Sequence, residues 1–310
     1  MISSLGFAVG KFTDAGLVRE ANEDSLIVRQ PEDQRQLSVK GSLFAVADGL
    51  GGHRAGEMAS TLATEMVARE YFADSSPDVA QSISRAIQRA NGEIYERSLE
   101  APARSGMAST FTAMVLRGAE YFFASVGDSR GYLLREGDLR QITQDHSLLG
   151  EQVRAGLLAP DGVRDGRGRN LLTRAVGRHP EVQVDVFEVP AQAGDTVLLC
   201  TDGLWGLCTD EEMKEAIANQ PDPQAAVQSL VSLAKERGAP DNITAMVIHA
   251  FDQPGQPVVP AIEYKEEAPA HLQEVARPSP QVILLLGMIA LLLLLLAAPA
   301  IWFLYQLMAR

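Results

Sequence analysis

The sequence is poor in cysteine and in positive charge, and each shortage argues against a class of protein. Its 310 residues include only 2 cysteines, Cys200 and Cys208, so we expect no disulfide framework and a reducing compartment. The 27 basic residues are outnumbered by 40 acidic ones, and a net charge of −13 disfavours a general nucleic-acid binder. Residues 1–14 lack a basic start and a long apolar run, so we expect no secretory signal peptide.

Residues 1–251 alternate apolar runs of strand length with stretches of helical spacing. The expected strands are SLGFAVG near the N-terminus, LFAVA at 43–47, and the runs at 111–116, 121–126, 131–135, 184–189, 195–200 and 243–250. The expected helices are Gly56–Phe72, with Met58, Leu62, Met66 and Val67 on one stripe, and 78–99, 210–218 and 224–236. Short connections between neighbouring strands favour antiparallel pairing. We therefore predict an α+β fold of sheets covered by helix layers.

The composition changes after residue 251. Residues 252–280 hold six prolines and several acidic residues without periodicity, which predicts an extended, semi-rigid linker. Residues 281–305 are uncharged and rich in leucine, and from Val282 onward a helix would span roughly 36 Å, against a hydrocarbon core of about 30 Å. A buried soluble helix is the alternative, which six consecutive leucines disfavour. We predict one transmembrane helix, a short tail at 306–310, and a cytoplasmic N-terminal domain.

Four acidic motifs follow one another along the chain. They are RxxNED at Arg19–Asp24, ADGLGGH at Ala47–His53, TDGL at Thr201–Leu204 and PDN at Pro240–Asn242. An Asp-Gly pair alone usually forms only a turn. Here, however, Asp48 follows the run LFAVA and Asp202 follows TVLLCT, and both runs predict buried strands. Both carboxylates are therefore expected at strand ends, where a rigid scaffold can hold them together.

Converging carboxylates need a counter-charge. Asp24, Asp48, Asp202 and Asp241 would bring four negative charges together, and these repel unless protons or cations neutralise them. No paired cysteine and histidine pattern lies nearby, so a zinc site is disfavoured and oxygen ligands favour Mg²⁺ or Mn²⁺. Gly49 has no side chain to shield its own carbonyl from such an ion. The motifs therefore predict a site for two divalent cations.

Taken in this order, the four motifs resemble those of the metal-dependent serine/threonine protein phosphatases of type 2C, in particular the bacterial branch. VGDSRGYLLR at 126–135 and RNLLTRAVG at 169–177 extend the resemblance over nearly all of residues 5–250. It implies a central antiparallel β-sandwich flanked by helix pairs. Residues 1–251 would then be the catalytic domain, attached through the linker to the membrane helix.

The resemblance also implies a set of metal ligands. Asp48 would bridge two Mg²⁺ or Mn²⁺ ions, Asp202 and Asp241 would complete the ligands of one ion, and the Gly49 carbonyl would help hold the other. Asp128 would form a third, weaker site with Asp202, although a simple turn residue is an equal alternative. Two further ligands would act mainly through coordinated waters, Glu23 and Asp24.

Three more residues receive roles from the resemblance. Arg19 would bind the substrate phosphate, because a guanidinium can hold two oxygens at once. His53 would be the general acid that protonates the serine or threonine leaving group. Asn242 would support the site without ligating a metal. A water activated by the cations would attack phosphorus in line, and no covalent enzyme intermediate is required.

The arginines of segment 164–178 stand out in an acidic protein, and a solvated loop is the ordinary explanation. We instead expect this segment to help attract phosphorylated substrates. Its arginines are Arg164, Arg167, Arg169, Arg174 and Arg178.

The sequence thus predicts a membrane-anchored phosphatase that acts on phosphorylated proteins and opposes a bacterial serine/threonine kinase. One alternative is a partner-switching phosphatase that acts on a regulatory antagonist protein, although no sensor domain accompanies the motifs. The other is a non-catalytic membrane scaffold that binds phosphoproteins, against which the intact acidic motifs argue.

Overall fold

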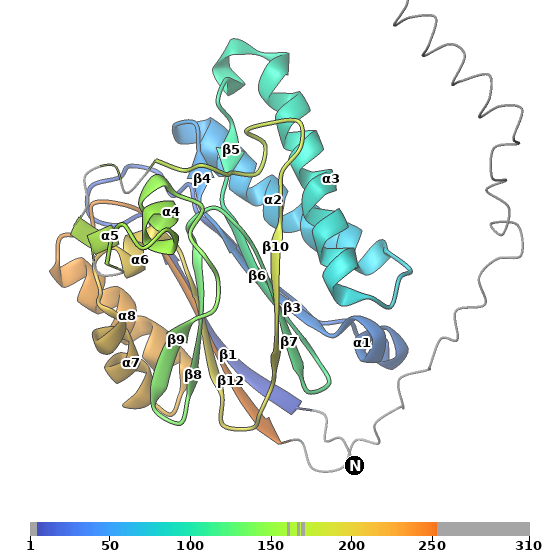
Figure 1. The fold of residues 1–310 in the computed structure, drawn as a ribbon, viewed down its shortest axis with the longest axis vertical. Helices are drawn as coiled ribbons and strands as arrows, with labels where there is room; N and C mark the ends of the chain where they lie inside the picture. Colours follow the sequence, from blue (N-terminus) through green and yellow to red (C-terminus); the bar gives the residue numbers. More distant parts are fainter. Residues whose placement is uncertain (1–4, 160–161, 166–167, 169–170, 253–310) are drawn as a thin grey trace, which may run out of the picture. The chain divides into compact units, whose positions relative to one another are not determined.

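Two five-stranded antiparallel sheets form the centre of the protein in the computed structural model, which describes residues 5–159, 162–165, 168 and 171–252 (Figure 1). The first sheet has the strand order β1 (Leu5–Asp14), β12 (Ile243–Asp252), β11 (Thr196–Cys200), β8 (Arg130–Arg135) and β9 (Asp138–Gln141). The second has the order β10 (Asp185–Pro190), β7 (Glu120–Val126), β6 (Phe111–Arg117), β3 (Ser42–Ala47) and β2 (Ser25–Arg29). The predicted α+β fold with antiparallel sheets is confirmed.

Central strands are buried on both faces, which explains why their sequences do not alternate with polar residues. In β3 the side chains of Leu43 and Ala45 join the apolar layer between sheet and helices. Phe44 and Val46 point the other way, into the layer between the two sheets. Because successive strand residues face opposite sides, a strand covered twice must be apolar throughout. The run LFAVA is therefore the sequence of an interior strand.

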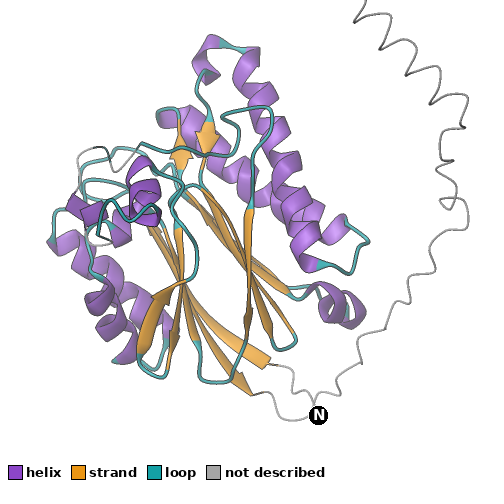
Figure 2. Cartoon of the chain, in the orientation of Figure 1, coloured by secondary structure: helices purple, strands orange, loops and turns teal. Residues whose placement is uncertain are grey.

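Helices cover both outer faces of the sheets (Figure 2). The second sheet is covered by α2 (His53–Ala73) and α3 (Val79–Glu100), and the first by α7 (Asp210–Ala218) and α8 (Pro223–Glu236). The smaller elements are α1 (Gln34–Lys40), α4 (Leu148–Arg154), α5 (Gly162–Asp165), α6 (Asp202–Trp205), the 3-10 turn η1 (Pro102–Arg104), and the pair β4 (Gly49–Leu50) and β5 (Ala108–Ser109). The expected helix pairs are present.

One residue of the expected apolar stripe on α2 is placed differently. Met66 and Val67 are buried as predicted, but Met58 is 36% exposed. The buried stripe instead passes through Ala55 and Ala59, which lie one turn apart, and Ala59 directly follows Met58 in the sequence. Neighbouring helix positions point about 100° apart, so a stripe through Ala59 turns Met58 away from the core.

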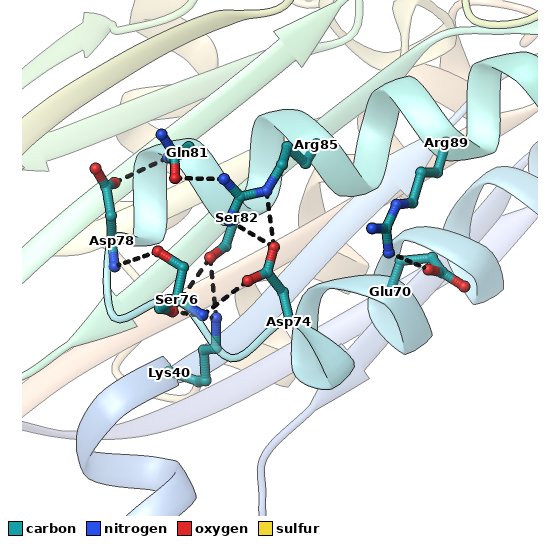
Figure 3. Close-up of polar contacts among 9 residues, drawn as sticks. All are labelled: Lys40, Glu70, Asp74, Ser76, Asp78, Gln81, Ser82, Arg85 and Arg89. Carbon is teal, nitrogen blue, oxygen red and sulfur yellow. Dashed lines mark hydrogen bonds and ion pairs between the residues drawn. The ribbon is translucent and has the colours of Figure 1, made fainter. Parts of the chain in front are cut away.

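The connection between α2 and α3 is held by buried polar contacts (Figure 3). The carboxylate of Asp74, which ends α2, accepts hydrogen bonds from the Arg85 guanidinium at 2.7 and 2.9 Å. Lys40, at the end of α1, is buried, and its Nζ donates to the Ser76 carbonyl at 2.7 Å and to the Ser82 hydroxyl at 2.9 Å. Burial lowers the pKa of this lysine below its usual value. These bonds fasten α1 to the helix pair.

The predicted linker and membrane helix, 252–280 and 281–305, lie outside the described residues apart from Asp252, where β12 ends. No helix in the part of the chain that the structure describes has the length and apolar character needed to cross a membrane. The C-terminal anchor therefore stays a prediction.

Candidate active site

A cavity of about 120 Å³ lies where the ends of several strands meet. All four acidic motifs contribute to its wall. Its lining residues are Arg19, Glu23, Asp48, Gly49, Leu50, Asp128, Leu172, Asp202, Asp241 and Asn242. Asp24 is buried close behind this wall, since Asp48, Asp202 and Asp241 all act on its ionisation.

Strand topology explains why residues so distant in sequence meet here. Asp202 lies two residues after the end of β11, while Asp128 and Asp241 lie two residues before β8 and β12, the two strands paired with β11. Because both pairings are antiparallel, the end of β11 lies beside the beginnings of β8 and β12. Asp48 directly follows β3 of the opposite sheet. The cavity is therefore formed between the two sheets at one end.

Hydrogen bonds with Thr110 and Ser109 fix the main chain of Asp48 without using its carboxylate. Its N–H donates to the Thr110 hydroxyl at 2.8 Å, and its carbonyl accepts from the Thr110 N–H at 2.9 Å and from the Ser109 hydroxyl at 2.8 Å. Both hydroxyl residues are fully buried. Sequence reasoning missed them, because nothing in a Ser-Thr pair indicates a partner about sixty positions away.

At three glycines near the cavity, a neighbouring atom lies so close to the backbone that an added Cβ would overlap it. A Cβ on Gly49 would lie 2.2 Å from the Gly56 carbonyl oxygen, and a Cβ on Gly56 would lie 1.9 Å from Oε2 of Glu23. On the other side, a Cβ on Gly203 would lie 1.9 Å from the Asn242 carbonyl oxygen. Such contacts are too short for any Cβ. Glycine therefore determines how near the Glu23 carboxylate lies to α2.

The Asn242 side chain holds the segment that contains the first motif. Its Oδ1 accepts from the Glu23 N–H at 2.8 Å. Its Nδ2 donates to the carbonyls of Ala15 at 3.0 Å and Ala21 at 2.9 Å. An amide suits this position because it offers one acceptor and two donors at once. Asn242 thus fastens both ends of the loop that presents Arg19.

Burial and mutual repulsion shift the ionisation of the carboxylates. Burial, followed by the charges of Asp24 and Asp202, raises the pKa of Asp48 well above its usual range. Burial and Asp202 raise the pKa of Asp128 in the same way. Burial raises the pKa of Asp24 to about 7, although the Thr201 hydroxyl donates to its Oδ2 at 2.9 Å. Concentrated negative charge in a low-dielectric cavity needs a compensating positive charge.

The donor set fits hard divalent cations. Oδ1 of Asp24 is buried and has no hydrogen-bond partner among the described residues, as expected of an atom whose partner is an ion or its water. Mg²⁺ and Mn²⁺ prefer the carboxylate and carbonyl oxygens that Asp48, Gly49, Asp202 and Asp241 offer. Within the described ranges, however, no three acidic, histidine or cysteine side chains are already gathered into one ligand cluster.

Arg19 and Asp241 are paired with each other. Arg19 is bound through two nitrogens, with Nε 3.0 Å from Oδ1 and Nη2 3.0 Å from Oδ2 of Asp241. This partner raises the pKa of the guanidinium further. About half of the Arg19 side chain remains exposed at the cavity mouth. Arg19, the predicted phosphate-binding residue, is thus bound to Asp241, a predicted metal ligand. The positions of the two motifs in the sequence do not indicate this pairing.

The backbone of His53 begins α2, but its side chain lies outside the described part of the structure. Its predicted role as general acid is therefore not tested. The same holds for the predicted roles of the other site residues, since no bound ligand accompanies them. What the structure adds is their position around one cavity.

His146 and Trp205 support the Asp128 loop, and sequence reasoning gave neither a role. The Trp205 Nε1–H donates to the Asp128 carbonyl at 2.9 Å. Nδ1 of the buried His146 accepts from the Gly127 N–H at 3.1 Å, so its proton resides on Nε2, 3.0 Å from Asp185 Oδ2. Burial lowers the pKa of this histidine, which favours the neutral ring. Trp205 thus holds Asp128 by its carbonyl, and His146 holds the preceding residue, Gly127, by its N–H.

In the arginine-rich segment 164–178, the side chains of three of the five arginines lie outside the described residues, namely Arg164, Arg167 and Arg169. Arg174 is paired with Asp185 at 2.8 Å, which neutralises much of its charge. Arg178 is exposed and donates to the Leu172 carbonyl at 3.1 Å. Recruitment of phosphorylated substrates by this segment stays a prediction. Of its two arginines whose side chains are described, Arg178 is the exposed one.

Comparisons with known proteins agree with this geometry. Residues 9–243 match the model of the family described as protein phosphatase 2C. The serine/threonine phosphatase stp of Listeria monocytogenes serotype 4b is 35% identical over 240 residues, covering 76% of this chain and 93% of that protein. The crystal structure of the Mycobacterium tuberculosis phosphatase PstP/Ppp is 35% identical, with a TM-score of 0.69, and covers 81% of this chain and 100% of that one. A PstP catalytic domain in complex with 2 manganese ions is 34% identical, with a TM-score of 0.69, covering 80% and 100%.

Gly56→Ala tests whether the missing side chain at this position sets where the Glu23 carboxylate lies. The added methyl overlaps the Glu23 carboxylate, so we expect Mn²⁺ affinity, measured by calorimetry, to fall about tenfold. Gly92→Ala is the matched control, because nothing lies within 4 Å of its Cβ in the middle of α3. The control should keep the parent affinity and gain about 0.5–1 kcal/mol of stability. Unchanged Mn²⁺ affinity in Gly56→Ala would contradict this role of the glycine.

The raised pKa of Asp24 predicts how stability depends on pH in chelator-treated protein. Between its ordinary pKa of 3.8 and about 7, the folded state holds a proton that the unfolded state has lost. The contribution of Asp24 to the free energy of unfolding is therefore complete below this pH window. It falls as pH rises through the window, by up to about 1.4 kcal/mol per pH unit. Thermal unfolding in EDTA should show Tm falling by roughly 2–4 °C per unit. Asp24→Asn should flatten this slope, and an equally steep slope in that variant would exclude Asp24 as its source.

Proposed function

This chain belongs to the protein phosphatase 2C family, and from that premise we propose that it hydrolyses phosphoserine and phosphothreonine in proteins at a binuclear Mg²⁺ or Mn²⁺ centre. It is a serine/threonine protein phosphatase by its similarity to named enzymes across the whole domain. The observation that supports the metal-dependent mechanism is the meeting of Asp48, Asp128, Asp202 and Asp241 in one cavity with Arg19 at its mouth. Manganese is supported by the related PstP domain, which binds 2 of these ions.

The acidic residues in and behind the cavity wall each receive a part in this proposal. Asp48, Gly49, Asp202 and Asp241 would hold two cations, Glu23 and Asp24 would act through waters, and Asp128 with Asp202 would hold a third cation. Cations held there would supply positive charge for the phosphoryl oxygens and would lower the pKa of the attacking water. Asn242 keeps the Arg19 loop in place through its three hydrogen bonds.

The bond changes then follow in line. The water oxygen forms a new bond to phosphorus, the bond from phosphorus to the serine or threonine oxygen breaks, and that oxygen takes a proton, which we assign to His53. Arg19 stabilises the charge that develops on the non-bridging oxygens, since its exposed half faces the cavity mouth. The Arg19 contact with Asp241 keeps the guanidinium oriented before substrate binds.

We further propose that the phosphatase opposes a bacterial serine/threonine kinase and is anchored to the cell membrane by residues 281–305, with the catalytic domain in the cytoplasm. The uncharged composition of that segment and the proline-rich sequence of 252–280 support the anchor. The kinase is supported by the substrate chemistry, because phosphorylated serine and threonine require an enzyme that produces them.

Phosphate release from a phosphothreonine peptide tests the catalytic proposal. We expect turnover with Mn²⁺ or Mg²⁺ and none in EDTA, and Asp48→Asn should lower kcat by on the order of 100-fold or more. Asp33→Asn, on a loop outside the cavity where Asp33 caps α1, is the control and should retain the parent rate. Turnover that survives both EDTA and Asp48→Asn would contradict a metal-dependent site.

Cell fractionation tests the anchor. The full chain should sediment with membranes and resist extraction by high salt and by alkaline carbonate, whereas a variant with Arg in place of Leu293 and Leu294 should shift toward the soluble fraction, because a charge at the centre of a membrane helix is costly. Recovery of the full chain in the soluble fraction would exclude a transmembrane segment. Phosphopeptide turnover by both proteins controls for folding of the catalytic domain.

A further inference from the structure

Exposed apolar side chains border the cavity on two sequence segments. The large apolar side chains exposed in the described residues are Leu17, Val18, Met58, Leu99, Leu148, Leu157, Leu171 and Phe251. Leu17 and Val18 directly precede Arg19, and Leu171 directly precedes Leu172. Arg19 and Leu172 both line the cavity. Scattered exposed leucines need no explanation, but a group beside a binding cavity marks an interaction surface.

The turn that presents Leu17 and Val18 is held in a fixed position. The Leu17 N–H donates to the Ala239 carbonyl at 2.9 Å, and the Gly16 N–H donates to Asp14 Oδ1 at 2.9 Å. Gly16 has a φ of +80°, and a Cβ there would lie 2.3 Å from the Asp241 carbonyl oxygen. The turn therefore packs directly on the segment that contains Asp241, while Leu17 and Val18 stay 62% and 68% exposed. Fixed apolar groups bind a partner without a large ordering cost.

A second apolar edge is similarly attached to the fold. The Leu148 N–H donates to the Leu171 carbonyl at 2.9 Å, and Ser147 pairs with Leu172 as an isolated β-bridge. Leu148 begins α4 and is 43% exposed, and Leu171 is 58% exposed. This edge therefore offers two leucines next to the cavity residue Leu172. Leu17, Val18, Leu148 and Leu171 are called the apolar rim below.

The size of the cavity leaves most of a protein substrate outside it. About 120 Å³ lined mainly by carboxylates accommodates a phosphorylated side chain but not the neighbouring residues of the peptide. An extended peptide advances about 3.3 Å per residue and turns alternate side chains to opposite sides. Residues within two positions of the phosphorylated one therefore lie up to about 7 Å from it along the peptide, outside the cavity and within reach of the residues that border it. Acidic residues there would face the carboxylate-rich wall as well as the −13 net charge of the chain.

We propose that the apolar rim selects phosphopeptides with an apolar side chain within two residues of the phosphoserine or phosphothreonine. This inference rests on the proposed phosphatase function and names the class of substrate for that same site. Its contacts bury apolar surface on both partners, so they contribute to binding of peptides and proteins but not of a small phosphate ester. The rim thus discriminates between substrates, and the reacting atoms are unaffected by it.

Unmodified full-length protein provides the first test. Two phosphothreonine peptides of equal length and charge are compared, one with leucine and one with serine at the positions two before and two after the phosphothreonine, together with p-nitrophenyl phosphate. We expect kcat/KM to be about five- to tenfold higher for the leucine peptide. Equal values for the two peptides would overturn the proposal. Failure to turn over any of the three substrates would instead contradict the phosphatase function itself.

Rim variants provide the second test. The double variant Leu17→Ser, Val18→Ser and the single variant Leu171→Ser should each lose most of the preference for the leucine peptide, through a higher KM. Turnover of the serine peptide and of p-nitrophenyl phosphate should change less than about twofold, because neither uses the rim. Leu99→Ser is the matched control, since Leu99 is 69% exposed near the end of α3 and does not line the cavity. Retention of the full preference in both rim variants would overturn the proposal.

Discussion

Repulsion among buried carboxylates is the constraint on which the organisation of this protein depends. Burial raises the pKa of Asp24, Asp48 and Asp128, so the site is costly until cations enter it. Around Asp48 the fold provides hydrogen bonds to the main chain rather than to the carboxylate. Thr110 and Ser109 make these bonds. Asp48 is thereby held near the other acidic groups while its carboxylate oxygens remain available to ions.

Much of the architecture was predictable from local patterns, because both the strands and the helix pairs have strong apolar periodicity. LFAVA and TVLLCT predicted β3 and β11, and the motifs that follow them predicted the cavity residues. The short edge strands were missed for a physical reason. In β9, DLRQ is partly exposed along its whole length, and β2 is half-buried, so neither has a distinctive pattern. The stripe on α2 was misplaced at Met58 because small alanines, rather than the larger methionine, face the core.

Other parts of the site have no local signal at all. The pairing of Arg19 with Asp241 joins residues 222 positions apart. The motifs predict phosphate binding for Arg19 and metal binding for Asp241, so neither motif indicates the contact. Gly56 and Gly203 matter through the backbone atoms that they let come close, which is a property of the fold. His146 acts on Asp128 only through the Gly127 main chain. Such residues become visible when the tertiary structure shows which atoms meet.

The pairing of the first and last strands determines where the rest of the polypeptide is attached. In the β1–β12 ladder, Asp14 faces Ile243 beside the carboxylates of the cavity, and Leu5 faces Asp252 nine residues away at the other end. At about 3.3 Å per residue, the end of the ladder at Leu5 and Asp252 lies roughly 30 Å from the end beside the cavity. Both ends of the described domain, Leu5 and Asp252, therefore lie at the end of the ladder that is away from the cavity.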